Sequence, residues 1–154
     1  MAHRPHLELW DYLPYLINRV GSALVVRFSE DALRNTQLNI ATWRVLAALS
    51  HNGPLRQIDI AEITSIEVST ISRLITRLVQ LSLVRRARSR TSNREVIVAL
   101  TPKAAALVSR LIPIAEELQE TATQGLSRQD LEVLKRALRH MHKNLMEHGT
   151  LPSR

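Results

Sequence analysis

The sequence has no cysteine and only 4 glycines among its 154 residues. The absence of cysteine excludes disulfide bonds, thiolate metal sites and a cysteine nucleophile, and no glycine-rich loop is present that could bind phosphate groups. No apolar run approaches the roughly 18 residues that span a membrane. Charged and polar residues also interrupt the N-terminus where a signal peptide needs an apolar core. We therefore expect a soluble, cytoplasmic protein with no membrane partner.

The six histidines give little support to an enzymatic function. None lies in an H-E-x-x-H motif or beside a glycine-framed nucleophile. His140 and His142 would point to different faces of a helix, which argues against a shared zinc site. An interfacial zinc site that also uses Glu116 or Glu120 is the alternative. We predict that the protein is not an enzyme and has no catalytic residue, metal site or cofactor.

Positive charge is what the sequence has in excess. The formal net charge is +7, the sequence pI is about 11.0, and 45% of the residues are hydrophobic, enough for one core. A basic chain favours polyanionic partners, nucleic acid first among them. Charge alone also permits an anionic membrane surface or an acidic protein, so the arrangement of the basic residues has to decide.

Apolar spacing predicts a mainly helical chain. Leucine, isoleucine and valine recur every three or four residues from Leu13 to Phe28, and Pro14 suits the first turn of that helix. Asn39 is the expected N-cap of a second helix that ends near His51–Pro54. A short helix is expected over Leu55 to Ile63.

The segment from Val68 to Leu81 has the pattern of a recognition helix. Its apolar stripe is Ile71, Leu74, Ile75, Leu78 and Leu81. Hydroxyls and arginines occupy the other faces, and none of these residues is acidic. After a short helix and a tight turn, such a helix can enter the major groove and contact bases and phosphates. An ordinary amphipathic helix with a solvated polar face is the alternative.

A basic β-hairpin is expected directly after this helix. Val96 to Leu100 alternates with period two and pairs with Val84 to Ala87, while the loop between them is Ser89 to Arg94. Such a hairpin is a wing, whose arginines can follow phosphates or enter the minor groove. The alternative is that the arginines only discourage strand-to-strand aggregation.

The last third of the chain predicts two long helices. Thr101-Pro102 is an N-cap followed by proline, and Ser127 to Asp130 resembles a capping box. The final helix has the a/d spacing of a helix that packs along another helix, through Leu131, Leu134, Leu138, Met141 and Leu145. It either covers its own domain or, as we favour, helps to form a two-fold dimer.

These elements, from about Leu13 to Leu145, resemble the MarR family of bacterial transcriptional regulators. The most specific match is SNREVIVALT, which is similar to the family's wing pattern of Asp-x-Arg followed by a strand ending in Leu-Thr. Ser92 replaces the aspartate of that pattern, so we expect a looser wing tip. Ser82 and Ala104 stand where the family commonly has glycine. We expect both changes to be mild, because Ser82 lies at a helix end and Ala104 within a helix.

The resemblance implies a mainly α fold with a small β-hairpin wing: a winged helix-turn-helix plus a helical dimerisation layer. Residues 39–101 would form the DNA-binding lobe, and residues 8–34 and 102–147 the dimerisation region. The implied function is a sequence-specific regulator, most simply a repressor, that binds a palindromic operator in double-stranded DNA as a homodimer. The expected DNA contacts are Ser69, Thr70, Ser72, Arg73, Thr76, Arg77, Arg86, Arg88, Arg90 and Arg94.

The resemblance also implies that a small aromatic or lipophilic anion releases the regulator from DNA. The residues that can supply aromatic walls and a countercharge are Trp10, Tyr15, Arg19, Trp43 and Arg44. Burial of Trp43 in the core and solvation of the two arginines is the competing interpretation. The functional alternative is a winged-helix protein-interaction module whose basic face docks an acidic partner.

Overall fold

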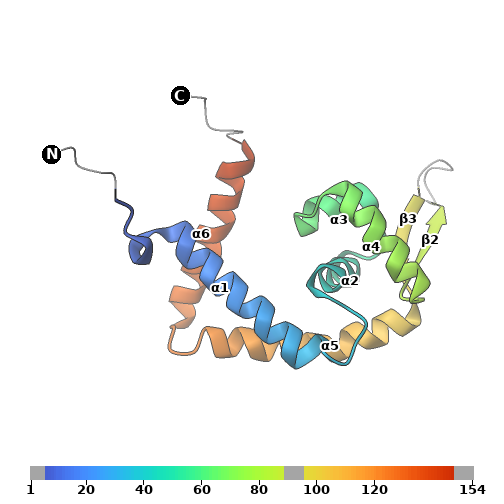
Figure 1. Cartoon of the computed structure of the whole chain (residues 1–154), viewed down its shortest axis with the longest axis horizontal. Helices are drawn as coiled ribbons and strands as arrows, with labels where there is room; N and C mark the ends of the chain where they lie inside the picture. Colours follow the sequence, from blue (N-terminus) through green and yellow to red (C-terminus); the bar gives the residue numbers. More distant parts are fainter. Residues whose placement is uncertain (1–5, 89–95, 148–154) are drawn as a thin grey trace. The chain divides into compact units, whose positions relative to one another are not determined.

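The computed structural model describes residues 6–88 and 96–147. In chain order the elements are η1 (Leu9–Asp11, 3-10), α1 (Leu13–Phe28), η2 (Ser29–Leu33, a π-helical turn), α2 (Ile40–Asn52), β1 (Leu55–Arg56), α3 (Gln57–Thr64), α4 (Val68–Gln80), β2 (Val84–Arg88), β3 (Val96–Leu100), α5 (Pro102–Ala122) and α6 (Arg128–Glu147) (Figure 1). The chain forms two compact units, Met1–Leu118 and Gln119–Arg154. No helix in the described ranges has both the length and the hydropathy needed to cross a membrane.

Helix α2 begins at the N-cap that the sequence predicts. The Asn39 side chain accepts a hydrogen bond from the Thr42 amide (2.9 Å), and the Thr42 hydroxyl accepts one from the Asn39 amide (2.9 Å). Each residue thus satisfies a polar group of the other, which fixes the first turn. Thr42 is completely buried.

The helix-turn-helix consists of α3 and α4, joined by a short turn in which Ser65 has a left-handed backbone conformation. Ser65 has φ 54°, and the amide of Ile66 donates to the carbonyl of Ala61 (3.1 Å). This pattern closes α3 and reverses the chain within three residues, so that α4 can start at Val68 and pack against α3. The predicted helix-turn-helix is confirmed.

The wing strands belong to a three-stranded antiparallel sheet with the order β1-β3-β2. The predicted pairing of β2 with β3 is confirmed, with Val84 opposite Leu100 and Arg88 opposite Val96. The expected helix over Leu55 to Ile63 is wrong at its start, because Leu55 and Arg56 pair with β3 and the helix begins at Gln57. A strand of two residues is too short to show a period-two pattern, so no periodicity in the sequence could indicate it.

One hydrophobic core holds the unit Met1–Leu118 together. Helices α2, α3 and α4, which Figure 1 shows beside the strands, pack against one another. The completely buried apolar side chains are Val45, Leu46, Ile60, Ile71, Ile75, Leu78, Val98 and Ala104. Because three of these lie on one stripe of α4, the core sets which face of that helix points outward.

The exit from α4 differs from our expectation for Ser82. Ser82 has φ 57°, a left-handed backbone conformation that glycine adopts at lower cost, and the amide of Leu83 donates to the carbonyl of Leu78 (2.9 Å). The replacement of glycine at this position therefore imposes strain, contrary to the mild effect we expected. Ala104 is fully buried within α5, where it needs no special conformation.

Helix α5 begins at its predicted cap and is tied to the end of α4. The Thr101 hydroxyl accepts from the Ala104 amide (3.2 Å) and donates to the Ser82 carbonyl (2.8 Å). Lys103 Nζ donates to the Leu81 carbonyl (2.9 Å). A lysine at this position places positive charge at the negative end of the α4 dipole.

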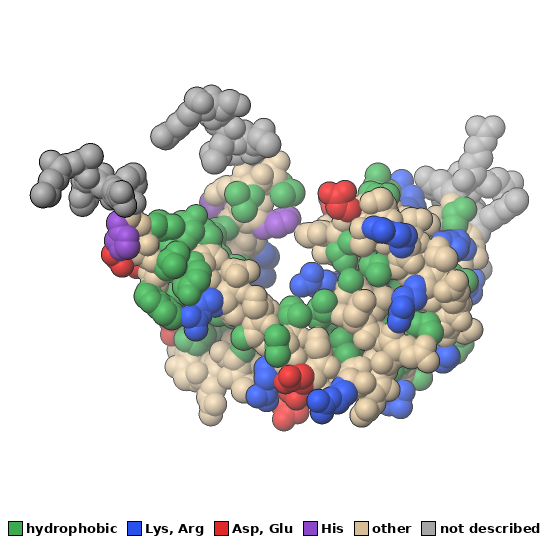
Figure 2. Space-filling view, viewed as in Figure 1, with side chains coloured by type: hydrophobic (Ala, Val, Ile, Leu, Met, Phe, Trp, Pro, Cys, Tyr) green, Lys and Arg blue, Asp and Glu red, His purple; other side chains and the backbone are tan. Residues whose placement is uncertain are grey.

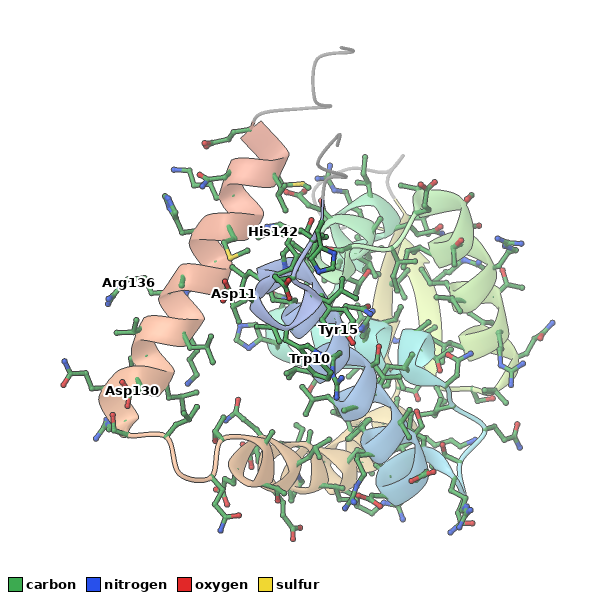
Figure 3. All side chains as sticks on the ribbon, turned by 60° about the vertical axis from the view of Figure 1, so that its left-hand side comes forward. Trp10, Asp11, Tyr15, Asp130, Arg136 and His142 are labelled. Carbon is green, nitrogen blue, oxygen red and sulfur yellow. The ribbon has the colours of Figure 1, made fainter. Side chains whose placement is uncertain are left out.

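The described part of the unit Gln119–Arg154 comprises the end of α5, a turn and α6. Gly125 has φ 89° in the turn, and the Ser127 hydroxyl accepts from the Asp130 amide (3.1 Å), as the predicted capping box requires. Asp130 is labelled at the start of α6 in Figure 3. No residue of α6 is buried, and Leu134, Leu138 and Leu145 expose 44%, 40% and 70% of their surface.

Candidate nucleic-acid interface

The polar face of α4 is exposed because its apolar stripe is held in the core. Five of the six predicted contacts on this helix are exposed and Thr70 is half-buried; the exposed ones are Ser69, Ser72, Arg73, Thr76 and Arg77. The helix has 13 residues and is therefore about 20 Å long. A helix of this kind can enter the major groove, with its hydroxyls and guanidinium groups directed at base edges and phosphates.

The two arginines of α4 have different surroundings. Arg73 makes one long contact within the helix, from Nη2 to the Thr70 hydroxyl (3.3 Å). Arg77 donates from Nη2 to the main-chain carbonyl of Gln37, 40 residues earlier (3.1 Å). The Arg73 side chain is therefore less constrained than that of Arg77 and can more readily contact a base. Arg77 also links α4 to the segment before α2 through its hydrogen bond to Gln37.

Strand β2 adds cations beside α4. Arg85 and Arg86 are exposed, and Arg86 donates from Nη2 to the hydroxyl of Thr76 on α4 (3.0 Å). Arg88 is the last residue of β2, where its backbone pairs with Val96. The other two predicted wing contacts, Arg90 and Arg94, lie outside the described residues.

The described cations of this surface form no ion pair with a described carboxylate. Among the ion pairs within the described ranges, none includes Arg73, Arg77, Arg85 or Arg86. Figure 2 shows several Lys and Arg side chains on the face that carries the helix-turn-helix and the strands. An uncompensated set of cations beside hydroxyl groups suits a phosphate backbone.

Some features of this interface were missing from the sequence prediction. The roles of Gln37 as acceptor for Arg77, and of Thr76 as acceptor for Arg86, depend on contacts between elements.

The sequence prediction also missed an ion pair at the start of α3, which Arg56 and Asp59 form (2.7 Å). Their spacing of three residues near a helix N-terminus was the available signal. The Arg56 guanidinium, which donates hydrogen bonds to the carboxylate, lowers the pKa of Asp59.

The predicted ligand-binding residues fall into separate places. Trp10 and Tyr15 contact each other edge to face, with ring centroids 5.8 Å apart (Figure 3), and the Arg19 guanidinium lies 4.5 Å from the Trp10 ring. This cluster attaches η1 to α1. Trp43 instead packs on Phe28 at 5.1 Å between centroids, on the edge of the core.

Arg44 lines a hollow between α1 and α2. The hollow has a volume of about 490 Å³, which lies within the range of about 300–1,000 Å³ typical of ligand pockets. Its α1 wall includes Ile17, Val25 and Gly21, and a side chain added at Gly21 would meet no other atom within 4 Å. Of the five predicted ligand-binding residues, Arg44 alone is in the lining, so the structure does not bring the five together.

No group of three or more His, Asp or Glu side chains suited to a metal ion exists in the part of the chain that the structure describes. The absence of catalytic residues and cofactors stays a prediction.

The chain is similar to several known regulators. A sequence model of the MarR family matches residues 36–95. The HTH-type transcriptional repressor NicR of Pseudomonas putida is 30% identical over 134 residues, which cover 87% of this chain and 84% of NicR.

Two solved structures have the same fold. BpsR of Bordetella bronchiseptica, studied for the regulation of its DNA binding by 6-hydroxynicotinic acid, has 28% identity and a TM-score of 0.74, covering 84% of this chain and 98% of that one. A MarR-family regulator from Silicibacter pomeroyi has 28% identity and a TM-score of 0.80, covering 92% and 97%. NicR is a transcriptional repressor, the Silicibacter pomeroyi protein is a transcriptional regulator, and BpsR binds DNA. The chain therefore belongs to the MarR family of winged helix-turn-helix transcriptional regulators.

Proposed function

We propose that the protein is a repressor that binds a palindromic operator in double-stranded DNA as a homodimer. The observation that carries the proposal is the exposed face of α4, where Ser69, Ser72 and Arg73 lie beside Arg85 and Arg86 of β2, and no ion pair among the described residues includes these three arginines. NicR, the relative with 30% identity, is a transcriptional repressor, which supports the direction of regulation.

In this proposal residues 39–101 contact DNA, and residues 8–34 and 102–147 form the dimer. Each part of the proposed dimerisation region exposes apolar side chains. Trp10 and Val20 expose 68% and 58% of their surface, and α6 exposes Leu134, Leu138 and Leu145 of its a/d face. Figure 2 shows apolar side chains gathered over η1 and α1. Such surfaces mark protein interfaces, and two-fold symmetry of the protein matches a palindromic site.

The proposed DNA contacts divide by role. Arg73, which has no partner outside its helix among the described residues, reads a base, while Arg86 and the arginines of the wing contact phosphates. Loss of a bidentate arginine–guanine contact costs about 1–3 kcal/mol at one base pair. Loss of a phosphate contact weakens binding to all sequences alike and reduces the salt dependence.

We propose the hollow between α1 and α2 as the effector site. Its apolar α1 wall and the Arg44 cation suit a small aromatic carboxylate. BpsR, which is regulated by 6-hydroxynicotinic acid, supports this ligand class and makes that acid the first probe. The ligand releases DNA only if it prefers the conformation that does not bind the operator.

The test is selection of genomic fragments by the purified protein at about 150 mM salt, followed by footprinting and repetition with Arg73→Ala. We expect a palindrome protected over about two helical turns and altered preference in Arg73→Ala. Arg136→Ala on α6 is the matched control and should leave the preference unchanged.

A steep salt dependence should accompany this binding, because six to ten phosphate contacts lose about 10³–10⁵ in affinity between 50 and 200 mM salt. Fragments without a shared motif would contradict the proposal. They would favour the alternative, a winged-helix module whose basic face docks an acidic protein.

A further inference from the structure

Val68, the first residue of α4, presents an apolar side chain at the start of the recognition helix. It exposes 50% of its surface, more than any other apolar residue of this helix, and it is not part of the hydrophobic core cluster. Valine is also a poorer helix former than the straight-chain residues. Neither burial in the core nor helix propensity therefore accounts for a valine at this position.

The first turn of α4 is fixed by the neighbours of Val68. Ile66 and Ile71 occupy the positions of a hydrophobic staple; Ile71 is buried, and Ile66 packs against the core. The Glu67 carbonyl accepts the first hydrogen bond of the helix, from the Ile71 amide (2.9 Å). These contacts begin the helix without the Val68 side chain, which is available to a partner outside the chain.

The position of Val68 is one that approaches bases when a helix of this kind binds DNA. Ser69 is the next residue, and Ser72 lies four residues further along, on the same side of the helix as Val68; both serines are exposed. Side chains tilt toward the N-terminus of their helix, so Val68 projects toward the leading end of α4. Recognition helices contact base edges mainly through their N-terminal residues.

The charge next to Val68 favours a base over a phosphate. Glu67 is exposed, its side chain makes no capping hydrogen bond, and no ion pair among the described residues includes it. The sequence from Val68 to Arg88 contains no acidic residue. Because the Glu67 carboxylate repels phosphates, the start of α4 suits the bases, and the arginines further along suit the DNA backbone.

Thymine is the base that offers an apolar group, its C5-methyl, in the major groove, where the other bases are recognised through polar atoms. We propose that Val68 is a specificity-determining residue that contacts the methyl group of one thymine in each half-site of the operator. The inference rests on the proposed function and deepens it, because it names a base that the operator contains. Arg73 lies five residues further, about 7.5 Å along the helix axis. The thymine therefore lies within about two base-pair steps of the base that Arg73 reads.

The test uses the full chain and the operator recovered by the genomic selection. Each thymine of a synthetic operator is replaced in turn by deoxyuridine, which pairs with adenine in the same way and lacks only the methyl group. The Kd of each duplex is measured by fluorescence anisotropy at about 150 mM salt. Replacement of one particular thymine in a half-site should weaken binding about fourfold, the equivalent of about one buried methyl group.

Variants assign this effect to Val68. Val68→Ala should bind the thymine operator about fourfold more weakly than the unaltered protein and should lose nothing further when that thymine becomes deoxyuridine. The variant should fold, because the position is exposed and alanine favours a helix. Val68→Ile, which keeps the branched side chain, should retain the difference between the two bases.

Ile63→Ala is the matched control. Ile63 lies on α3 and exposes 50% of its surface, as Val68 does, so this substitution also truncates a half-exposed apolar side chain. It should leave the difference between thymine and deoxyuridine unchanged. If Val68→Ala binds too weakly for a Kd, Val68→Thr, which keeps one of the two methyl groups, takes its place and should reduce the difference.

The outcomes separate this inference from the proposed function. A difference between thymine and deoxyuridine that persists in Val68→Ala, or that Ile63→Ala also removes, would overturn the role of Val68. A palindromic operator in which no thymine methyl affects binding would do the same, while the proposed function would stand. A selection without a shared motif would refute the proposed function and this inference with it.

Discussion

Arg86 on β2 donates a hydrogen bond to the hydroxyl of Thr76 on α4 (3.0 Å), and that hydroxyl in turn donates to the carbonyl of Ser72 (3.0 Å). The chain of two bonds connects the wing to the middle of the recognition helix. Arg86 is thereby held beside the face of α4 that we propose contacts DNA. Thr76 is accordingly a positioning residue as well as a potential DNA contact.

Removal of this hydroxyl should weaken DNA binding through Arg86. Thr76→Val keeps the shape of the side chain but leaves Arg86 without its acceptor. In a double-mutant cycle with Arg86→Gln, measured as operator affinity at fixed salt, we expect a coupling of about 0.5–1.5 kcal/mol. Ser69→Ala with Arg86→Gln is the control pair, since no hydrogen bond joins them, and its effects should add. Additive losses for Thr76→Val would contradict the positioning role.

Glycine at position 82 should stabilise the protein. Ser82 has φ 57° at the end of α4, a conformation that costs an L-residue roughly 1–2 kcal/mol more than glycine. Part of that gain is offset by the greater flexibility of unfolded glycine, so we expect Ser82→Gly to raise the free energy of unfolding by about 0.5–1 kcal/mol. Urea denaturation is the measurement.

The matched control places the same substitution within a regular helix. Ser109 lies in α5, and Ser109→Gly should lower the free energy of unfolding by about 0.5 kcal/mol. Effects of the same sign for Ser82→Gly and Ser109→Gly would show that the left-handed conformation of Ser82 carries no cost.

The N-cap of α2 should be one of the sensitive polar positions of the fold. Asn39→Ala removes the acceptor for the Thr42 amide and should destabilise the protein by about 1 kcal/mol, within a usual range of about 0.5–2 kcal/mol. Asn39→Asp retains an acceptor and adds negative charge at the helix N-terminus, so its stability should be close to that of the unaltered protein. Thermal and urea unfolding of both variants give the comparison, and equal destabilisation by the two would contradict capping.

The ion pair of Arg56 and Asp59 should make stability depend on pH on the acid side. The guanidinium holds the pKa of Asp59 below its ordinary value, so the folded state favours the ionised carboxyl. The stabilisation is fully present above the unfolded pKa of about 3.9 and is lost as the pH falls through the lower folded pKa.

Asp59→Asn tests this dependence. The variant should be less stable than the unaltered protein at pH 7, and the difference should shrink as the pH is lowered toward 3. The difference at pH 7 should also shrink in about 1 M salt, because salt screens exposed pairs. A difference that stays constant over this pH range would show that ionisation of Asp59 does not contribute.

Polar residues on the a/d face of α6 should disrupt the proposed dimer. Leu134→Gln with Leu138→Gln removes two exposed leucines and should increase the monomer fraction in light-scattering measurements. Arg136→Gln with Lys143→Gln changes the opposite face of the same helix and should leave the dimer intact. If the unaltered protein is a monomer, this face is not a dimer interface. The same conclusion would follow if the leucine pair and the control pair changed the monomer fraction equally.

Much of the fold was predictable because its determinants are local. The caps at Asn39, Thr101 and Ser127 act within three residues, and the apolar stripe of α4 needs only the helical period. The helical period also predicts the polar face of α4, and the composition of β2 predicts its basic character. The sequence by itself therefore determined which surface can bind a polyanion.

Only the tertiary structure decided which residues meet across elements. The strand at Leu55 exists because β3 supplies its partner, and the strain at Ser82 arises because α4 must end where Thr101 binds its carbonyl. The brace between Arg77 and Gln37 joins residues 40 positions apart. Contacts of this kind depend on how packed elements dock, which short-range periodicity does not encode, and they determine which arginines are left free to act.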